Sequence, residues 1–108
     1  MNTQYKKGVL ELCVLALLEK QSRYGYEISE QLSGHIPIAD GTVYPILRKL
    51  KSDGLLTTYL QEESGGPPRK YYSLTGLGRE TYQADRTEYL AFAGAVQKLL
   101  EEDGHDKN

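Results

Sequence analysis

The chain has 108 residues, of which 39% are hydrophobic and 26% charged, and its formal net charge is −2. This length supports one domain with a modest core and is too short for two independent ones. The near-neutral charge excludes a generally basic protein. The longest apolar run, Val9–Leu18, is about half as long as the roughly 20 residues needed to cross a membrane, so we expect no membrane partner.

This apolar run predicts a first helix at the centre of the core. Only Glu11 in it is charged, and apolar residues nearly surround the helical wheel, so we expect the helix to be enclosed on most sides. The single cysteine, Cys13, lies inside the run, where neither a disulfide nor a metal cluster can form, and we expect it to be inert core. The opening residues lack the pattern of a signal peptide, which favours the cytoplasm.

A second, short helix is predicted to begin near Tyr24. Tyr24, Ile28 and Leu32 recur at i, i+4 and i+8, which is the spacing of one helical face. Gly34 follows where a left-handed C-terminal cap is common, so we expect the helix to end there.

The third helix is predicted within residues 41–54, GTVYPILRKLKSDG, with a length of about 13 residues or roughly 20 Å. Its buried stripe comprises Val43, Ile46, Leu47 and Leu50. Asp40 or Thr42 can act as N-cap, which places Pro45 within or just after the first turn. The ring is tolerated there because backbone N–H groups of the first turn mostly lack intrahelical partners. Gly54 is expected to end the helix.

An antiparallel hairpin and a long helix complete the chain. The segments LLTTYLQEE and RKYYSL are rich in strand-forming residues and are separated by SGGPP, a turn-forming cluster. Thr75 is expected to cap the final helix, which continues to the acidic tail EEDGHDKN. The apolar positions of that helix are Tyr82, Tyr89, Phe92, Ala93, Val96, Leu99 and Leu100.

Three helices followed by a two-stranded ribbon is the order of a winged helix-turn-helix, a mainly α fold with a small β-hairpin. We expect residues 1–74 to form this domain and residues 75–108 to form a C-terminal dimerisation helix with its tail, in one compact unit. Residues 1–74 carry nine basic and eight acidic groups, whereas residues 75–108 carry four and seven. An anion-binding surface is therefore expected in the first part.

The outward face of the third helix suits the DNA major groove. Gly41, Pro45 and Ser52 make its centre slim, and the residues around that centre can donate hydrogen bonds to bases or phosphates. The expected DNA contacts on helix and wing are Thr42, Tyr44, Pro45, Arg48, Lys49, Lys51, Arg69 and Lys70. A basic helix face alone is usually only a solvated surface. Here the basic helix occurs in the order of two preceding helices, a wing and a long final helix, and this order favours DNA binding.

The same segments resemble the PadR-like family of transcriptional regulators. The matching pieces are KKGVLELCVLALL, YGYEI, GTVYPILRKLKSDGLL and PPRKYYSLTGLG, which cover most of residues 6–78 in the family's order. The resemblance implies a homodimeric winged-helix repressor without enzymatic activity, in which Thr42, Tyr44, Arg48 and Lys49 belong to the recognition helix. It also implies that Arg69 and Lys70 belong to the wing.

This chain departs from the family at the wing. Members often carry Gly-Arg-Pro-Arg-Lys, whereas this chain has Gly66-Pro67-Pro68-Arg69-Lys70 preceded by Glu62-Glu63, so we expect a weaker grip of the wing on phosphate. It also lacks a tryptophan of the kind with which some members stack a drug. The sequence leaves open whether a small aromatic or hydrophobic effector binds near Tyr89 or Phe92.

The length of the final helix predicts a homodimer. It exceeds the small domain that it must cover, so much of its apolar stripe would face water in a monomer. A two-fold dimer would place two recognition helices about one DNA turn, roughly 34 Å, apart on a pseudo-palindrome. The expected interface residues are Val9, Leu10, Cys13, Tyr82, Tyr89, Phe92, Ala93, Val96, Leu99 and Leu100. The alternative is a helix that folds back on its own domain.

Gly94 and Ala95 indicate either a close helix crossing or an effector cavity, and we favour the crossing.

Other functional classes fit less well. Cys13, His35 and His105 lie too far apart in the predicted layout to form a catalytic or metal site, and no nucleotide-binding glycine motif occurs, so we expect no enzyme, cofactor or metal. A winged helix that binds protein instead of DNA is the main alternative. Cations on both helix and wing favour double-stranded DNA as the partner.

Overall fold

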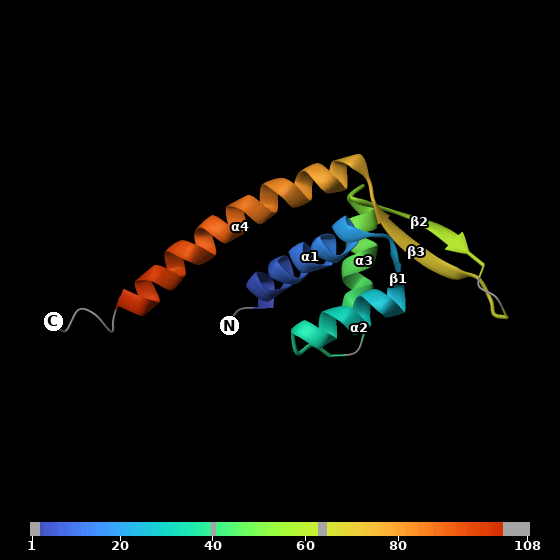
Figure 1. Ribbon diagram of the computed structural model, residues 1–108, viewed down its shortest axis with the longest axis horizontal. Helices are drawn as coiled ribbons and strands as arrows, with labels where there is room; N and C mark the ends of the chain where they lie inside the picture. The colour runs from blue at the N-terminus through green and yellow to red at the C-terminus, as the bar shows by residue number, and fades with distance from the viewer. Residues whose placement is uncertain (1–2, 40, 63–64, 103–108) are drawn as a thin grey trace.

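The computed structural model describes residues 3–39, 41–62 and 65–102. The elements are α1 (Thr3–Lys20), β1 (Arg23–Tyr24), α2 (Gly25–His35), α3 (Val43–Ser52), β2 (Leu56–Gln61), β3 (Arg69–Leu74) and α4 (Gly76–Glu102). Three helices pack together, the sheet extends from one side of them as a wing, and α4 runs back over α1 in the opposite direction (Figure 1). The winged helix-turn-helix with a long final helix is confirmed. Within the described ranges, no helix is both long enough and apolar enough to cross a membrane.

The core lies where α1, α2 and α3 meet the base of the sheet. Its buried apolar side chains are Val14, Leu15, Leu18, Ile28, Leu32, Val43, Ile46, Leu47, Leu50 and Leu56. All four residues of the stripe predicted for the third helix are among them, because a helix that rotates about 100° per residue brings these positions to one face. This packing turns the opposite face of α3 outward.

The protomer encloses α1 less completely than predicted. Val14, Leu15 and Leu18 are buried, whereas Val9 and Leu12 are only half-buried. Most of this helix's other apolar residues are half-buried too, because α2, α3 and the sheet cover one side and α4 crosses only part of the other. The expectation of a helix enclosed on most sides was therefore wrong for the single chain.

The sheet has three strands in the order β1-β3-β2, so the expected two-stranded ribbon was incomplete. β2 and β3 pair antiparallel with Leu56 opposite Leu74, as the predicted hairpin requires. The additional strand β1 is only two residues long and pairs with β3. Arg23 in β1 is buried, and its Nε donates a hydrogen bond to the Leu17 carbonyl oxygen at 3.1 Å. Two residues are too few for a periodic pattern, which is why the sequence did not reveal this strand.

Two helix boundaries also differ from the prediction. α2 starts after Tyr24 and continues through Gly34 to His35, and Gly34 does not have a positive φ. The predicted glycine cap was therefore wrong, because Ile36 ends the helix in an extended conformation while its N–H bonds to the Leu32 carbonyl. α3 has 10 residues instead of about 13. Thr42 is its N-cap, but the Thr42 side chain makes no capping hydrogen bond with the first turn. The alternative cap, Asp40, lies outside the described residues.

The joint between α3, the sheet and α4 is tightly hydrogen-bonded. Gly54 has a φ of 81° just after α3, where it ends the helix as predicted. The Thr75 hydroxyl donates to the Gly54 carbonyl at 2.7 Å and accepts from the Gly78 N–H at 2.9 Å. Thr75 thus caps α4, as predicted, and ties it to the end of α3. Gly78 is the buried residue of α4. A larger residue does not fit there, because its Cβ would lie 2.1 Å from the Leu55 carbonyl oxygen.

Candidate nucleic-acid interface

The outward face of α3 presents the side chains expected from the sequence. Tyr44, Pro45, Arg48 and Lys51 are exposed, and Thr42 at the N-cap is half-buried. Pro45 is the third residue of the helix, where its missing N–H costs no intrahelical hydrogen bond. The outward face of α3 can therefore carry this small residue without losing a helical hydrogen bond.

The ring of Tyr44 packs closely against the start of α2. A Cβ at Gly25 would lie 3.1 Å from Cε1 of Tyr44 and 3.7 Å from Cε1 of Tyr72. A larger residue at Gly25 would push these rings apart. This role of Gly25 was not predicted, since the distance between two segments in space leaves no periodic trace in the sequence.

A groove joins α3 to the wing. It has a volume of about 500 Å³, and its eight lining residues are Tyr24, Gly25, Tyr26, Tyr44, Arg48, Arg69, Lys70 and Tyr72. Three of these side chains are cationic, four are tyrosines, and none of the eight carries a carboxylate. Burial raises the pKa of Tyr72, while the positive charge of Arg48 partly opposes this rise. The groove thus combines positive charge with hydroxyl donors, which suits a phosphate backbone.

Sequence reasoning identified the three cations of the groove and Tyr44, but it missed Tyr24, Tyr26 and Tyr72. These tyrosines come from β1, α2 and β3, and only the pairing of β1 with β3 brings them beside α3. The YGY stretch at residues 24–26 is the available signal, but its spacing indicates a helix and not a groove lining.

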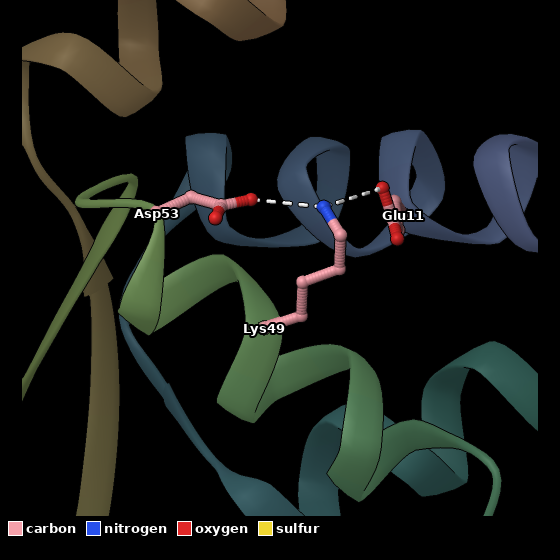
Figure 2. Close-up of polar contacts among 3 residues, drawn as sticks. All are labelled: Glu11, Lys49 and Asp53. Carbon is pink, nitrogen blue, oxygen red and sulfur yellow. Dashed lines mark hydrogen bonds and ion pairs between the residues drawn. The ribbon is translucent and has the colours of Figure 1, made fainter.

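Lys49 is placed differently from the other cations of α3. Its Nζ lies 2.8 Å from Oδ2 of Asp53 and 3.7 Å from Oε1 of Glu11, which belongs to α1 (Figure 2). The hydrogen bond to Asp53 is the largest cause of the raised pKa of Lys49, and the charge of Glu11 adds to it. These two ion pairs compete with the phosphate contact expected for Lys49.

The residues predicted for the dimer interface belong to α1 and α4 and differ in exposure. Leu10, Cys13 and Tyr82 pack against the core and are partly buried. Val9, Tyr89 and Ala93 are also half-buried. The exposed members are Phe92 (56% exposed), Val96 (36%), Leu99 (68%) and Leu100 (69%). Burial raises the pKa of Tyr89, and a hydrogen bond with Tyr5 contributes.

The far part of α4 runs past the N-terminal end of α1 (Figure 1). Its exposed apolar residues therefore have no covering element among those that the structure describes. The two helices are also joined by an ion pair, with Arg79 Nη1 3.5 Å from Oε2 of Glu19. In the single chain α4 packs on α1, while Leu99 and Leu100 near its C-terminal end stay exposed.

Within the ranges described by the structure, no group of three histidine, cysteine or acidic side chains could hold a metal ion. His35 is exposed, and its Nδ1 lies 3.0 Å from the Gln31 carbonyl oxygen of its own helix. Cys13 is a free thiol whose pKa is raised by burial.

Similarity to known proteins agrees with this geometry. The Transcriptional regulator PadR-like family matches residues 14–84, which include α2, α3, the wing and the start of α4. The transcriptional regulator Rv3488 of Mycobacterium tuberculosis is 30% identical over 77% of this chain and 78% of its own.

Solved structures show the same similarity. A Streptococcus transcriptional regulator superposes with a TM-score of 0.82 at 33% identity, covering 91% of this chain and 98% of its own. A PadR-like transcriptional regulator of Bacillus cereus gives a TM-score of 0.81 at 34% identity, covering 91% and 97%. These proteins are regulators and not enzymes. The chain therefore belongs to the PadR-like family of transcriptional regulators.

Proposed function

We propose that this protein represses transcription by binding a pseudo-palindromic DNA operator as a homodimer. The observation that carries the proposal is the groove in which Arg48 of α3 meets Arg69 and Lys70 of the wing without a carboxylate in its lining. A module that binds protein would have no reason to place cations on both elements.

The dimensions of α3 fit the major groove. Ten residues span about 15 Å at 1.5 Å per residue, and the groove is about 12 Å wide. With Pro45 keeping the first turn of the outward face slim, Arg48 can reach a guanine edge or a phosphate, and Thr42 and Tyr44 can donate to phosphates near the helix N-terminus. Lys51, together with Arg69 and Lys70 on the wing, supplies sequence-independent attraction.

The dimer is supported by the apolar surface of α4. Phe92, Leu99 and Leu100 are each more than half exposed and belong to the C-terminal half of α4. A second copy packed two-fold against α1 and α4 would cover them. The two α3 helices would then be presented together, about 34 Å apart, which matches successive major grooves on one side of the duplex.

The direct test is fluorescence anisotropy with duplex DNA taken from upstream of the protein's own coding region. We expect this duplex to bind about a thousandfold more tightly than a shuffled duplex, and binding should weaken steeply with salt. Arg48→Ala should remove about 1–3 kcal/mol of this preference. Failure of both duplexes to bind at low salt would refute a DNA-binding role at this operator and favour a protein partner.

Sedimentation equilibrium tests the dimer separately. Leu100→Asp places a charge in the proposed interface and should shift the protein toward monomer. Leu77→Asp is the matched control, because Leu77 is also exposed but lies at the wing end of α4, in the first turn where a carboxylate is favourable. Equal behaviour of the two variants would contradict the proposed interface.

We place the expected effector in the groove between α1 and α4. This groove has a volume of about 480 Å³ and combines the rings of Tyr5, Tyr89 and Phe92 with the carboxylates of Asp85 and Glu88. A flat apolar ligand with a positive charge would complement it. Release of the operator by such ligands, and its loss in Asp85→Asn at unchanged DNA affinity, would support this site; release that persists in Asp85→Asn would contradict it.

A further inference from the structure

A row of tyrosines crosses the outer face of the three-stranded sheet. Tyr71 of β3 stands directly opposite Tyr24 of β1 on one side and Tyr59 of β2 on the other. The ring centroids of Tyr59 and Tyr71 are 5.5 Å apart with planes inclined by 15°, and those of Tyr24 and Tyr71 are 5.8 Å apart at 51°. Cross-strand aromatic pairs of this kind stiffen a sheet. These ring contacts therefore join both strands of the hairpin to β1, which directly precedes α2.

Arg69 lies at the end of this row nearest to α3. It precedes Tyr71 by two residues in β3 and so belongs to the same face of the sheet. Its Cζ is 4.6 Å from the centroid of the Tyr24 ring, within the range of a cation–π contact. Tyr24 and Arg69 both line the groove that also contains Arg48. The ring thus holds the guanidinium beside the recognition helix.

We propose that Tyr24 is a positioning residue that keeps Arg69 ordered for a DNA phosphate. A ring packed against the flat face of a guanidinium leaves its in-plane N–H groups able to bind phosphate oxygens. A long side chain normally loses rotamer freedom when it binds, and a side chain already held by a ring loses less. The ring matters for this role, and the Tyr24 hydroxyl does not.

This inference rests on the proposed DNA binding, and it predicts a particular pattern of effects. Tyr24→Leu should weaken binding about two- to fivefold, the size of an exposed cation–π contact. The loss should be the same for operator and shuffled DNA, because a phosphate contact carries no sequence information. Tyr24→Phe should restore wild-type affinity, since it keeps the ring.

The experiment is a double-mutant cycle measured by anisotropy at one fixed salt concentration. Affinities are compared for wild type, Tyr24→Leu, Arg69→Ala and the double variant. Once Arg69 is alanine, Tyr24→Leu should cause no further loss. Tyr59→Leu is the matched control, since Tyr59 stacks on Tyr71 at the other end of the row, whereas the cation–π contact of Arg69 is with Tyr24. An equal loss in Tyr59→Leu would show that a loosened sheet explains the effect, and would overturn the proposal.

A second measurement does not depend on DNA. In the free protein, NMR signals of the Arg69 δ-methylene should be shifted upfield by the Tyr24 ring, and this shift should persist in Tyr24→Phe. An unshifted signal in the wild type would overturn the positioning role. If Arg69→Ala weakens DNA binding while Tyr24→Leu does not, only the role of Tyr24 fails. If the wild type binds no DNA, the proposed function fails instead.

Discussion

Gly78 of α4 is packed against the start of β2, and we expect Gly78→Ala to destabilise the protein by about 3 kcal/mol or more. A Cβ at this position would lie 2.1 Å from the carbonyl oxygen of Leu55 and 3.0 Å from its carbonyl carbon. Both contacts are with backbone, so no flexible side chain can move aside. The helix or the strand would have to shift by about 1 Å to relieve the overlap.

The magnitude follows from what such a shift disturbs. Overpacking a rigid core costs about 1–3 kcal/mol. The Leu55 carbonyl also accepts a hydrogen bond from the Thr75 N–H at 3.0 Å, and the Gly78 N–H donates to the Thr75 hydroxyl. Weakening these bonds adds about 1 kcal/mol or more. The gain in helix propensity from glycine to alanine, about 1 kcal/mol at most, is too small to compensate.

Gly34 provides the matched comparison for the same substitution. It lies inside α2 without a positive φ, and a Cβ there would have nothing within 4 Å. Gly34→Ala should therefore stabilise the protein by about 0.5 kcal/mol, because alanine loses less backbone entropy in a helix. A left-handed cap at Gly34, as the sequence suggested, would give the opposite sign.

Urea unfolding followed by circular dichroism at one protein concentration measures both variants, with the midpoint interpreted only if the slope m is unchanged. A Gly78→Ala protein as stable as the wild type would refute the close contact between α4 and Leu55. A destabilised Gly34→Ala protein would refute the course of α2.

Three further predictions concern α3, the joint and the thiol. Lys49→Ala should cost about 0.5–1 kcal/mol of stability and leave the salt dependence of DNA binding nearly unchanged. Lys51→Ala should instead lower the slope of that salt dependence by about one. Equal slopes for the two variants would show that Lys49 also contacts phosphate. Thr75→Val should lose about 1 kcal/mol or more in thermal unfolding because it removes a hydroxyl that both donates and accepts, and Thr75→Ser should restore most of it. Since burial raises the pKa of the Cys13 thiol, native protein should react with a disulfide reagent at pH 8 several-fold more slowly than urea-unfolded protein, and equal rates would contradict this. The stability linked to this raised pKa is present below the unfolded thiol's pKa of about 8.5 and is lost as the pH rises above it.

The sequence alone determined the helical elements and the hairpin because each depends on local spacing. The stripe from Val43 to Leu50 is a helical pattern that can be buried in only one way, and its burial turns Arg48 outward whatever surrounds the helix. The cluster SGGPP cannot continue a strand, and Thr75 is a strong helix cap, so the wing and the start of α4 were also predictable.

The tertiary structure alone decided which residues from distant segments meet. Two-residue strand β1 has no period, yet its pairing with β3 brings Tyr24 under Arg69. Lys49 looks like Lys51 in the sequence, and only the packing of α3 against α1 places it beside Glu11. In the sequence, Gly78 resembles any glycine of an exposed helix. Only the tertiary structure shows that the Leu55 carbonyl oxygen packs against it. Local pattern fixes the conformation of a segment and its buried face, whereas the contacts of a charge, a ring or a glycine depend on how the segments are packed together.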